Sequence, residues 1–268
     1  MKQADESTSE SLSVLHAGSW ESFPGLVHGF LGRRGGRSVD PWSSLNVSDR
    51  VGDDADAVAS NWEAVRRRFP GLRIARMRQV HGDRIVPIDD AGAGAGEADG
   101  MVTATAGVGL AILTADCVPI LMIAPAERIA MAVHAGWRGT VAGIAARAVA
   151  EGRRLFGVDP SAWHVALGPS IGVCCYEVSS EVGVDLERRW GAMGEAWRPA
   201  GEQPRGASVK RGMLDLRMAN RRILVEQGLA PERIVDVGPC TACASSDFFS
   251  HRRSGGRAGR QLSIVGWI

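Results

Sequence analysis

Three strongly apolar runs in close succession are the feature that most constrains how this chain can fold. They cover residues 109–114, 118–124 and 129–133, and only short turn-type segments separate them. Short apolar runs bounded by turn residues are typical of buried β-strands. Helical periodicity between further strands predicts a mixed α/β (α+β) fold in which a mixed β-sheet is sandwiched by helices. We expect helices at 53–69, 141–156 and 214–227, and further strands at 74–80, 84–88, 163–167, 234–237 and 262–267.

The length and charge of the chain limit its organisation and partners. We expect one compact domain over residues 15–268 of the 268, preceded by a polar, disordered tail over residues 1–14. The chain has 31 Lys and Arg against 30 Asp and Glu, so no strong field of one sign favours nucleic acid or an anionic membrane. No run approaches the roughly 18 apolar residues of a membrane span, and the N-terminus is unlike a signal peptide. These features predict a cytoplasmic protein.

Five cysteines are too few and too irregularly placed for a disulfide framework, which favours a reducing compartment. Cys240 and Cys243 have the spacing of a metal-binding or redox pair, but no second such pair exists. Cys174 and Cys175 are adjacent, and adjacent side chains point in opposite directions in an extended segment. We therefore predict packing roles for these four cysteines.

The fifth cysteine, Cys117, directly precedes the second apolar run, and His134 directly follows the third. If the hairpin between these runs closes with Pro125 and Ala126 at its tip, Ala124 pairs with Glu127 and Cys117 lies opposite His134. Their Cβ atoms would then be about 4.5–5.5 Å apart, close enough to share a ligand. A buried thiol and a hydrogen-bonded histidine would satisfy the same pattern, and the spacing alone leaves both interpretations open.

Several ordered motifs from about residue 41 to the C-terminus resemble one known family. This is the laccase-domain or purine nucleoside phosphorylase family, formerly described as multicopper polyphenol oxidoreductases. The matching segments are Ser44-Leu45-Asn46, Val51-Gly52-Asp53-Asp54, Gln79-Val80-His81-Gly82, Ala98-Asp99-Gly100, Thr114-Ala115-Asp116-Cys117-Val118-Pro119, Val133-His134-Ala135-Gly136-Trp137-Arg138-Gly139, Leu167-Gly168-Pro169-Ser170-Ile171-Gly172, Cys174-Cys175-Tyr176-Glu177, Leu214-Asp215-Leu216, Ala219-Asn220-Arg221, Cys240-Thr241, Phe248-Phe249-Ser250 and Arg252-Arg253.

The resemblance implies that His81, Cys117 and His134 are both catalytic residues and metal ligands. Two imidazoles and one thiolate leave a coordination position open, which suits catalytic zinc better than copper. The implied activities are phosphorolysis of adenosine, inosine and methylthioadenosine, a transferase reaction, and deamination of adenosine, a hydrolase reaction. His251 stands where the family usually has tyrosine, which affects the expected shape of the substrate pocket.

The partners implied are a small nucleoside and phosphate, with no oligomeric state predicted. Arg138, Arg252 and Arg253 are candidates for binding phosphate, because a guanidinium group binds it through two parallel hydrogen bonds. Asn46 can donate and accept hydrogen bonds to a sugar or base. Either Asp116 or Asp99 could carry protons during deamination, and Trp137 could stack on a purine.

Other functions fit parts of the same pattern. In a metal-free hydrolase or deamidase, Cys117 would be a nucleophile activated by His134, and His81 would not be needed. Hydrolytic editing of peptidoglycan precursors also remains open, as does a non-catalytic binding or structural zinc protein, although a structural site should have a fourth ligand. A copper oxidase acting on phenols is the least favoured, since multicopper sites need more than the six histidines present.

Overall fold

The computed structural model describes residues 12–93, 96–199 and 210–268. Its strands form three sheets. The five-stranded sheet has the order β1 (Val14–Leu15), β2 (Leu26–Leu31), β14 (Gln261–Trp267), β6 (Val108–Thr114) and β3 (Arg73–Ala75). The six-stranded sheet has the order β13 (Ile234–Asp236), β9 (His164–Leu167), β7 (Val118–Ala124), β8 (Ile129–Ala135), β5 (Gly100–Thr103) and β4 (Ile85–Pro87). The three-stranded sheet has the order β10 (Glu177–Ser179), β12 (Arg211–Leu214) and β11 (Trp197–Pro199).

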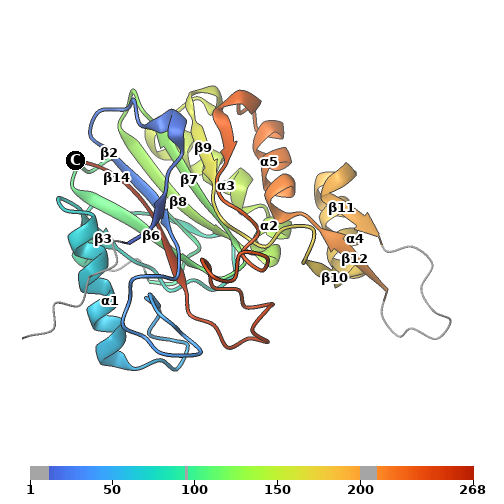
Figure 1. Ribbon diagram of the computed structural model, residues 1–268. Coiled ribbons are helices and arrows are strands. Elements are labelled where there is room, and N and C mark those ends of the chain that lie inside the picture. The colour runs from blue at the N-terminus through green and yellow to red at the C-terminus, as the bar shows by residue number, and fades with distance from the viewer. Residues whose placement is uncertain (1–11, 94–95, 200–209) are drawn as a thin grey trace, which may run out of the picture.

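The two larger sheets stack face to face with helices outside them (Figure 1). Helix α1 (Ala55–Arg68) packs on the outer face of the five-stranded sheet, while α3 (Ile144–Phe156) and α5 (Leu216–Glu226) pack on the outer face of the six-stranded sheet. The short α2 (Trp137–Ala142) follows β8, and α4 (Ser180–Trp190) packs on the three-stranded sheet. The predicted mixed α/β class with outer helices is confirmed, with stacked sheets in place of a single one.

The uninterrupted apolar runs are explained by strands that are buried on both faces. In β7, Ile120 and Met122 pack toward α3 and α5, whereas Leu121 and Ile123 pack against the five-stranded sheet. Every residue of β7 and β8 is buried. Because neither face meets water, these strands have no polar alternation. The same burial makes them a rigid base for side chains at their ends.

The hairpin between β7 and β8 forms, but with a longer turn than predicted. Ala124 pairs with Ile129 rather than with Glu127, so the connection contains four residues, and Arg128 has a left-handed φ of 52°. His134 consequently lies opposite Pro119 instead of Cys117. The predicted register is therefore wrong by two residues. A shift of two preserves the face on which each side chain lies, because side chains alternate with a period of two.

The predicted hairpin over residues 74–88 is wrong. Strands β3 and β4 belong to different sheets and do not pair with each other. Between them, the Gln79 side chain donates to the Leu113 carbonyl at 2.7 Å and accepts from the Leu113 amide at 2.9 Å. The Gln79 side chain thus makes the hydrogen bonds to Leu113 that a neighbouring strand would otherwise make. The turn at His81 is not part of a hairpin, so its side chain can contribute to a site.

The helices agree with the sequence patterns apart from their ends and two omissions, α2 and α4. Three predicted helices correspond to α1, α3 and α5, and Asp54 and Asp215 cap α1 and α5 by accepting backbone N–H groups. Most of the predicted tail, residues 1–11, lies outside the described residues. Val14 of β1 pairs with Leu31 of β2, so the predicted disorder is wrong at that residue.

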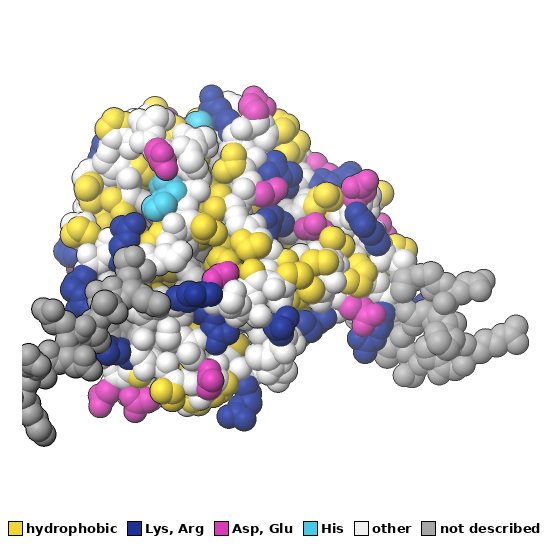
Figure 2. Space-filling model, viewed as in Figure 1, with side chains coloured by type: hydrophobic (Ala, Val, Ile, Leu, Met, Phe, Trp, Pro, Cys, Tyr) yellow, Lys and Arg dark blue, Asp and Glu magenta, His cyan; other side chains and the backbone are white. Residues whose placement is uncertain are grey.

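The surface visible in Figure 2 carries Lys and Arg side chains interspersed with Asp and Glu. This distribution matches the nearly balanced composition. Among the described residues, no helix is both long enough and apolar enough to cross a bilayer.

Candidate metal centre and cavity

Three side chains from distant parts of the chain meet at one edge of the six-stranded sheet. His81 lies in the loop before β4, Cys117 immediately precedes β7, and His134 is near the end of β8. Their ligand atoms all lie within 4.8 Å of one another, and the rings of His81 and His134 are 4.7 Å apart at an interplanar angle of 82°. The structure therefore brings together all three residues predicted as metal ligands.

A buried carboxylate, Asp99, organises two of these residues. Its Oδ1 lies 2.8 Å from Nδ1 of His134 and accepts the backbone N–H of His81 at 2.9 Å. Its Oδ2 accepts the amides of Gly82 at 2.7 Å and Val80 at 3.2 Å. These bonds hold His81 in a left-handed conformation, with φ of 62°, that a histidine rarely adopts. Because Nδ1 of His134 faces Asp99, its Nε2 is the nitrogen available to a metal.

The protonation equilibria of the site are strongly coupled. Burial raises the pKa of the Cys117 thiol, but His134 and His81 outweigh this and lower the pKa to about 6. Burial lowers the pKa of His134, whereas the Cys117 thiolate and Asp99 raise it to about 9. Asp99 has a lowered pKa because hydrogen bonds from His134 and backbone amides overcome the effect of its burial. A thiolate is thus available at neutral pH, which is the form that binds a metal.

The donor set fits a zinc ion. Two imidazoles and one thiolate provide three ligands, and the carboxylate behind His134 is the usual outer partner of a zinc-bound histidine. Space is restricted at Gly136, where an added Cβ would lie 3.0 Å from Cδ2 of His81 and 3.1 Å from Sγ of Cys117. Glycine at this position lets the imidazole and the sulfur approach each other.

A cavity of about 760 Å³ opens directly over these residues, a size ordinary for a small-molecule site. Its lining is rich in arginine: Arg50, Arg76, Arg78, Arg138, Arg252 and Arg260. Asp49 and Asp116 are its only acidic lining residues among the part of the chain that is described. The cavity therefore favours an anionic ligand.

The predicted substrate-binding residues are not all in the cavity. Arg138 lines it and stacks on Trp137, with the guanidinium carbon 4.3 Å from the ring centroid. Arg252 also lines it and donates to the Glu177 carbonyl at 2.8 Å. Arg253 is absent from the lining and donates to the Ala242 carbonyl at 3.0 Å.

Asn46 is fully buried and is also absent from the lining. Its side-chain amide donates to Asp53 at 2.8 Å and to the Ser48 carbonyl at 3.0 Å, and its oxygen accepts from the backbone amides of Ser48 and Arg260. These contacts fix the loop beside Arg260. A direct contact between Asn46 and a ligand has no support in this geometry.

The two carboxylates considered for proton transfer lie in different surroundings. Asp116 lines the cavity, and it accepts the Thr241 hydroxyl and the Arg252 backbone amide, each at 2.7 Å. Asp99 is completely buried behind His134 and does not line the cavity. The geometry thus gives Asp99 the role of orienting His134. Of these two carboxylates, only Asp116 could contact a ligand in the cavity.

Sequence reasoning missed several lining residues. Tyr176 is the only tyrosine of the chain, and its presence in a motif was a usable signal. Burial raises its pKa far above the ordinary value, so the hydroxyl stays protonated. Arg76, Arg78 and Arg260 carry no local pattern that distinguishes them from surface arginines.

The prediction of packing roles for the other four cysteines is wrong in part. Cys174 and Cys243 are exposed, and all four sulfur atoms lie within 4.8 Å of one another. The segment 173–175 is a turn, with the Cys175 amide donating to the Gly172 carbonyl at 3.0 Å. Adjacent side chains therefore need not point in opposite directions here.

The fold and site define a layered α/β protein with a candidate His₂Cys metal centre under an arginine-rich cavity. The chain belongs to the family described as "Multi-copper polyphenol oxidoreductase laccase", whose model matches residues 27–268. A protein of Geobacillus stearothermophilus named purine nucleoside phosphorylase YlmD is 39% identical over 260 residues, 91% of each chain. A purine nucleoside phosphorylase of Deinococcus radiodurans is 38% identical, covering 90% of this chain and 89% of the relative.

Solved structures confirm the relationship at the level of the fold. The crystal structure of YlmD from Geobacillus stearothermophilus has a TM-score of 0.79 and 37% identity, covering 91% of this chain and 93% of that one. A hypothetical protein, YfiH, from Bacillus licheniformis has a TM-score of 0.86 and 30% identity, covering 96% and 97%. The resemblance seen in the sequence motifs is thereby confirmed.

Proposed function

We propose that this protein is a zinc-dependent purine nucleoside phosphorylase that acts on adenosine, inosine and methylthioadenosine. The observation that carries the proposal is one cavity lined both by His81, Cys117 and His134 and by several arginines. The names of the relatives supply the substrate class. The cavity supplies a place for an anion beside three ligands for a metal.

Phosphate binding is assigned to Arg138 and Arg252. Among the described residues, neither guanidinium lies within 4.0 Å of a carboxylate, so neither charge is neutralised by an ion pair. Arg78, in contrast, is paired with Glu97 at 2.8 Å. A guanidinium group without an acidic partner keeps its positive charge available for phosphate. The printed hydrogen bonds of the Arg252 guanidinium, to the carbonyls of Cys175 and Glu177, both come from Nη1.

In the proposed reaction, a phosphate oxygen forms a bond to C1′ of the ribose as the bond from C1′ to the purine nitrogen breaks. The bonding electron pair leaves with the base, which takes up the proton that phosphate releases. Arg138 and Arg252 orient the phosphate and neutralise its charge, and Trp137 and Tyr176 line the walls against which a purine can pack. A bound zinc ion would supply Lewis-acid catalysis and activate water at neutral pH.

Deamination of adenosine is a second reaction that this site favours. Zinc deaminases use histidine and cysteine ligands together with a carboxylate that moves protons. Asp116, adjacent to Cys117 in the cavity wall, would take a proton from the attacking water and pass it to the departing amino group. The donor set fits this chemistry better than a copper oxidase, for which two site histidines are too few.

A product analysis tests both reactions. The zinc-loaded protein is incubated with adenosine, inosine or methylthioadenosine, with and without inorganic phosphate, and products are identified by mass spectrometry. Free base with the matching sugar 1-phosphate, formed only with phosphate, is the expected result, and inosine from adenosine reports deamination. Cys117→Ser should abolish both reactions. Absence of all these products from the zinc-loaded enzyme would reject the proposal in favour of a cysteine hydrolase or a cell-wall precursor substrate.

The arginine assignment is tested by its effect on phosphate. Arg138→Ala should raise the phosphate concentration needed for half-maximal rate by at least about tenfold, since it removes a charged contact of about 1.5–3 kcal/mol. Arg154→Ala is a matched control, because Arg154 lies on the exposed side of α3 and pairs with Glu151. An unchanged phosphate requirement in Arg138→Ala would remove this residue from the site.

A further inference from the structure

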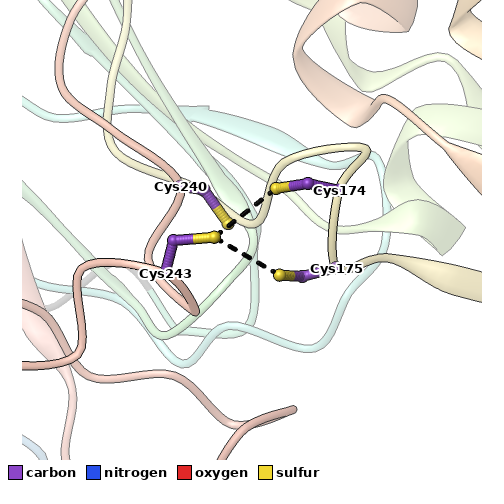
Figure 3. Close-up of side chains that lie close together, drawn as sticks. All are labelled: Cys174, Cys175, Cys240 and Cys243. Atoms are coloured by element: carbon purple, nitrogen blue, oxygen red, sulfur yellow. Dashed lines mark hydrogen bonds between the residues drawn. The ribbon is translucent and has the colours of Figure 1, made fainter.

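Cys174, Cys175, Cys240 and Cys243 form a second cluster of possible metal ligands outside the cavity lining (Figure 3). Figure 3 shows the four sulfur atoms pointing toward one another from two loops. Sγ of Cys243 lies 3.6 Å from Sγ of Cys174 and 3.5 Å from Sγ of Cys175. These distances exceed the roughly 2.05 Å of a disulfide by far. They are close to the separation of about 3.8 Å that four sulfurs have around zinc at 2.3 Å.

The backbone around Cys240 supports a thiolate at this place. The Gly172 amide donates to Sγ of Cys240 at 3.1 Å. Backbone amides of Ala242 and Cys243 also donate toward this sulfur. A Cys-x-x-Cys turn whose own amides point back to its first sulfur is suited to holding a metal-bound thiolate.

The other loop leaves space for the sulfurs. A Cβ added to Gly172 would lie 3.2 Å from Cβ of Cys240 and 3.4 Å from Sγ of Cys174. A side chain at this position would therefore press on the cluster. The turn that follows, with Cys175 bonded back to Gly172, directs two adjacent cysteine side chains to the same side.

Three arginines contact the backbone of the two loops that hold the cluster. Arg217 donates to the carbonyls of Gly238 and Pro239 at 3.0 and 3.4 Å, and Arg253 donates to the carbonyl of Ala242. Arg252 approaches the Cys175 carbonyl at 3.5 Å. Four thiolates around a divalent ion carry a net charge of −2, which these guanidinium groups would offset.

We propose that these four cysteines form a tetrathiolate zinc site distinct from the His81, Cys117 and His134 centre. Binding converts four thiols and Zn²⁺ into a Zn(S)₄ unit and releases four protons to solvent. With all four coordination positions taken by protein, the site is structural. It links the loop 168–176 to the loop segment 238–253, which carry Tyr176 and Arg252 to the cavity. Thr241 of the second segment donates to Asp116 in the cavity wall. The ion therefore fixes one wall of the proposed active site.

Zinc content measured on the purified full-length protein tests the site. The protein is saturated with zinc chloride under reducing conditions, freed of excess metal, and analysed by inductively coupled plasma mass spectrometry. We expect two zinc ions per chain, falling to one in Cys117→Ser and to one in Cys243→Ser. A Cys117→Ser protein that binds no zinc would overturn the proposal, whether or not the wild type has nucleoside activity.

X-ray absorption on the Cys117→Ser protein gives a second measurement that leaves all four cysteines intact. It should show sulfur neighbours only, at about 2.3 Å, without the nitrogen shell near 2.0–2.1 Å expected of histidine ligands. The X-ray absorption measurement on Cys117→Ser still tests the site if Cys243→Ser fails to fold. A nitrogen or oxygen shell would overturn the tetrathiolate site, as would stoichiometric iron in place of zinc. So would a loss of about four mass units in the denatured, unreduced protein, which indicates two disulfides.

Discussion

At the scale of single residues, the candidate metal centre depends on groups that are not ligands themselves. Asp99 holds the loop of His81 through three backbone amides and orients the ring of His134. Gly136 provides the space in which the ligands meet. Both residues occur in the recognised motifs, yet neither position is explained by sequence spacing.

The Asp99→Asn substitution should lower the zinc affinity of the His₂Cys centre by about 10- to 100-fold, because it weakens the outer partner of a ligand histidine. The new NH₂ group would also oppose one or more of the backbone amides that now donate to the carboxylate. Affinity is measured by competition with a chromophoric chelator in the Cys243→Ser background, which isolates this centre. Asp89→Asn, on an exposed residue, is the control. Equal affinities in the two variants would show that Asp99 does not support the ligands.

Gly136→Ala should weaken the same centre by roughly tenfold, comparable to losing an outer contact. The added methyl group would press on His81 and Cys117 at 3.0 and 3.1 Å, so these ligands would have to move by a few tenths of an ångström. Gly18→Ala is a suitable comparison, since nothing lies within 4 Å of a Cβ at that position. The zinc affinity of both variants is measured by the same chelator competition as for Asp99→Asn. An unchanged zinc affinity in Gly136→Ala would show that the added methyl group does not displace the ligands.

At the scale of elements, strand β2 contains a buried histidine, His28, whose partner in the sheet is Val265 of β14. His28 in β2 accepts the Ala17 backbone amide at 3.0 Å on Nε2, and only 6% of the residue is exposed. Burial, with a smaller contribution from His16, lowers the pKa of His28 to about 4. The neutral form is therefore the one that the folded protein accommodates.

This shift predicts that the protein is less stable at pH 5 than at pH 7. Between the unfolded pKa of about 6.5 and the folded pKa of about 4, the unfolded state binds the extra proton, so the contribution of His28 is lost as pH falls through this window. The loss from pH 7 to pH 5 is about 2 kcal/mol at a single site. Urea unfolding at both pH values measures it. His28→Gln should reduce the difference, and an equal pH dependence in this variant would contradict the assignment.

At the scale of the whole molecule, the two stacked sheets share an apolar layer between them. Leu121 of β7, Ile112 of β6 and Val265 of β14 are fully buried in this layer. The strands that hold Cys117 and His134 are therefore fixed from both faces, by α3 and α5 on one side and by the second sheet on the other. The metal centre is built at the end of the most completely buried part of the fold.

Leu121→Ala should lower the free energy of unfolding by about 2–5 kcal/mol, because it removes buried methyl groups and leaves a cavity between the sheets. Val184→Ala, at a site 55% exposed on α4, should change it by less than about 0.5 kcal/mol. Urea titration followed by tryptophan fluorescence compares the two variants with the wild type. A small effect of Leu121→Ala would indicate that the layers can close over the lost volume.

The amino-acid sequence determined by itself the existence and type of most elements. The apolar runs of β6, β7 and β8 and the periodicity and caps of α1 and α5 are local signals, because the burial of a segment dictates its composition. The motifs that carry His81, Cys117 and His134 were sufficient to identify the family, and the structure brings these three side chains together. The predicted proximity of Cys117 and His134 is correct although the predicted register is not. A shift of two residues keeps each side chain on the same face of the sheet.

Tertiary structure alone decided how distant segments combine. Residues 74–88 separate into two sheets because two of them bind distant partners. Gln79 binds Leu113 of β6, 34 residues away, and the backbone of His81 binds Asp99, 18 residues away. The cysteines at 174–175 and 240–243 meet because a turn and a Cys-x-x-Cys loop are brought side by side by contacts such as the bridge between Ser170 and Cys240. No local pattern encodes such distances, since they result from the packing of whole layers rather than from the preferences of any one segment.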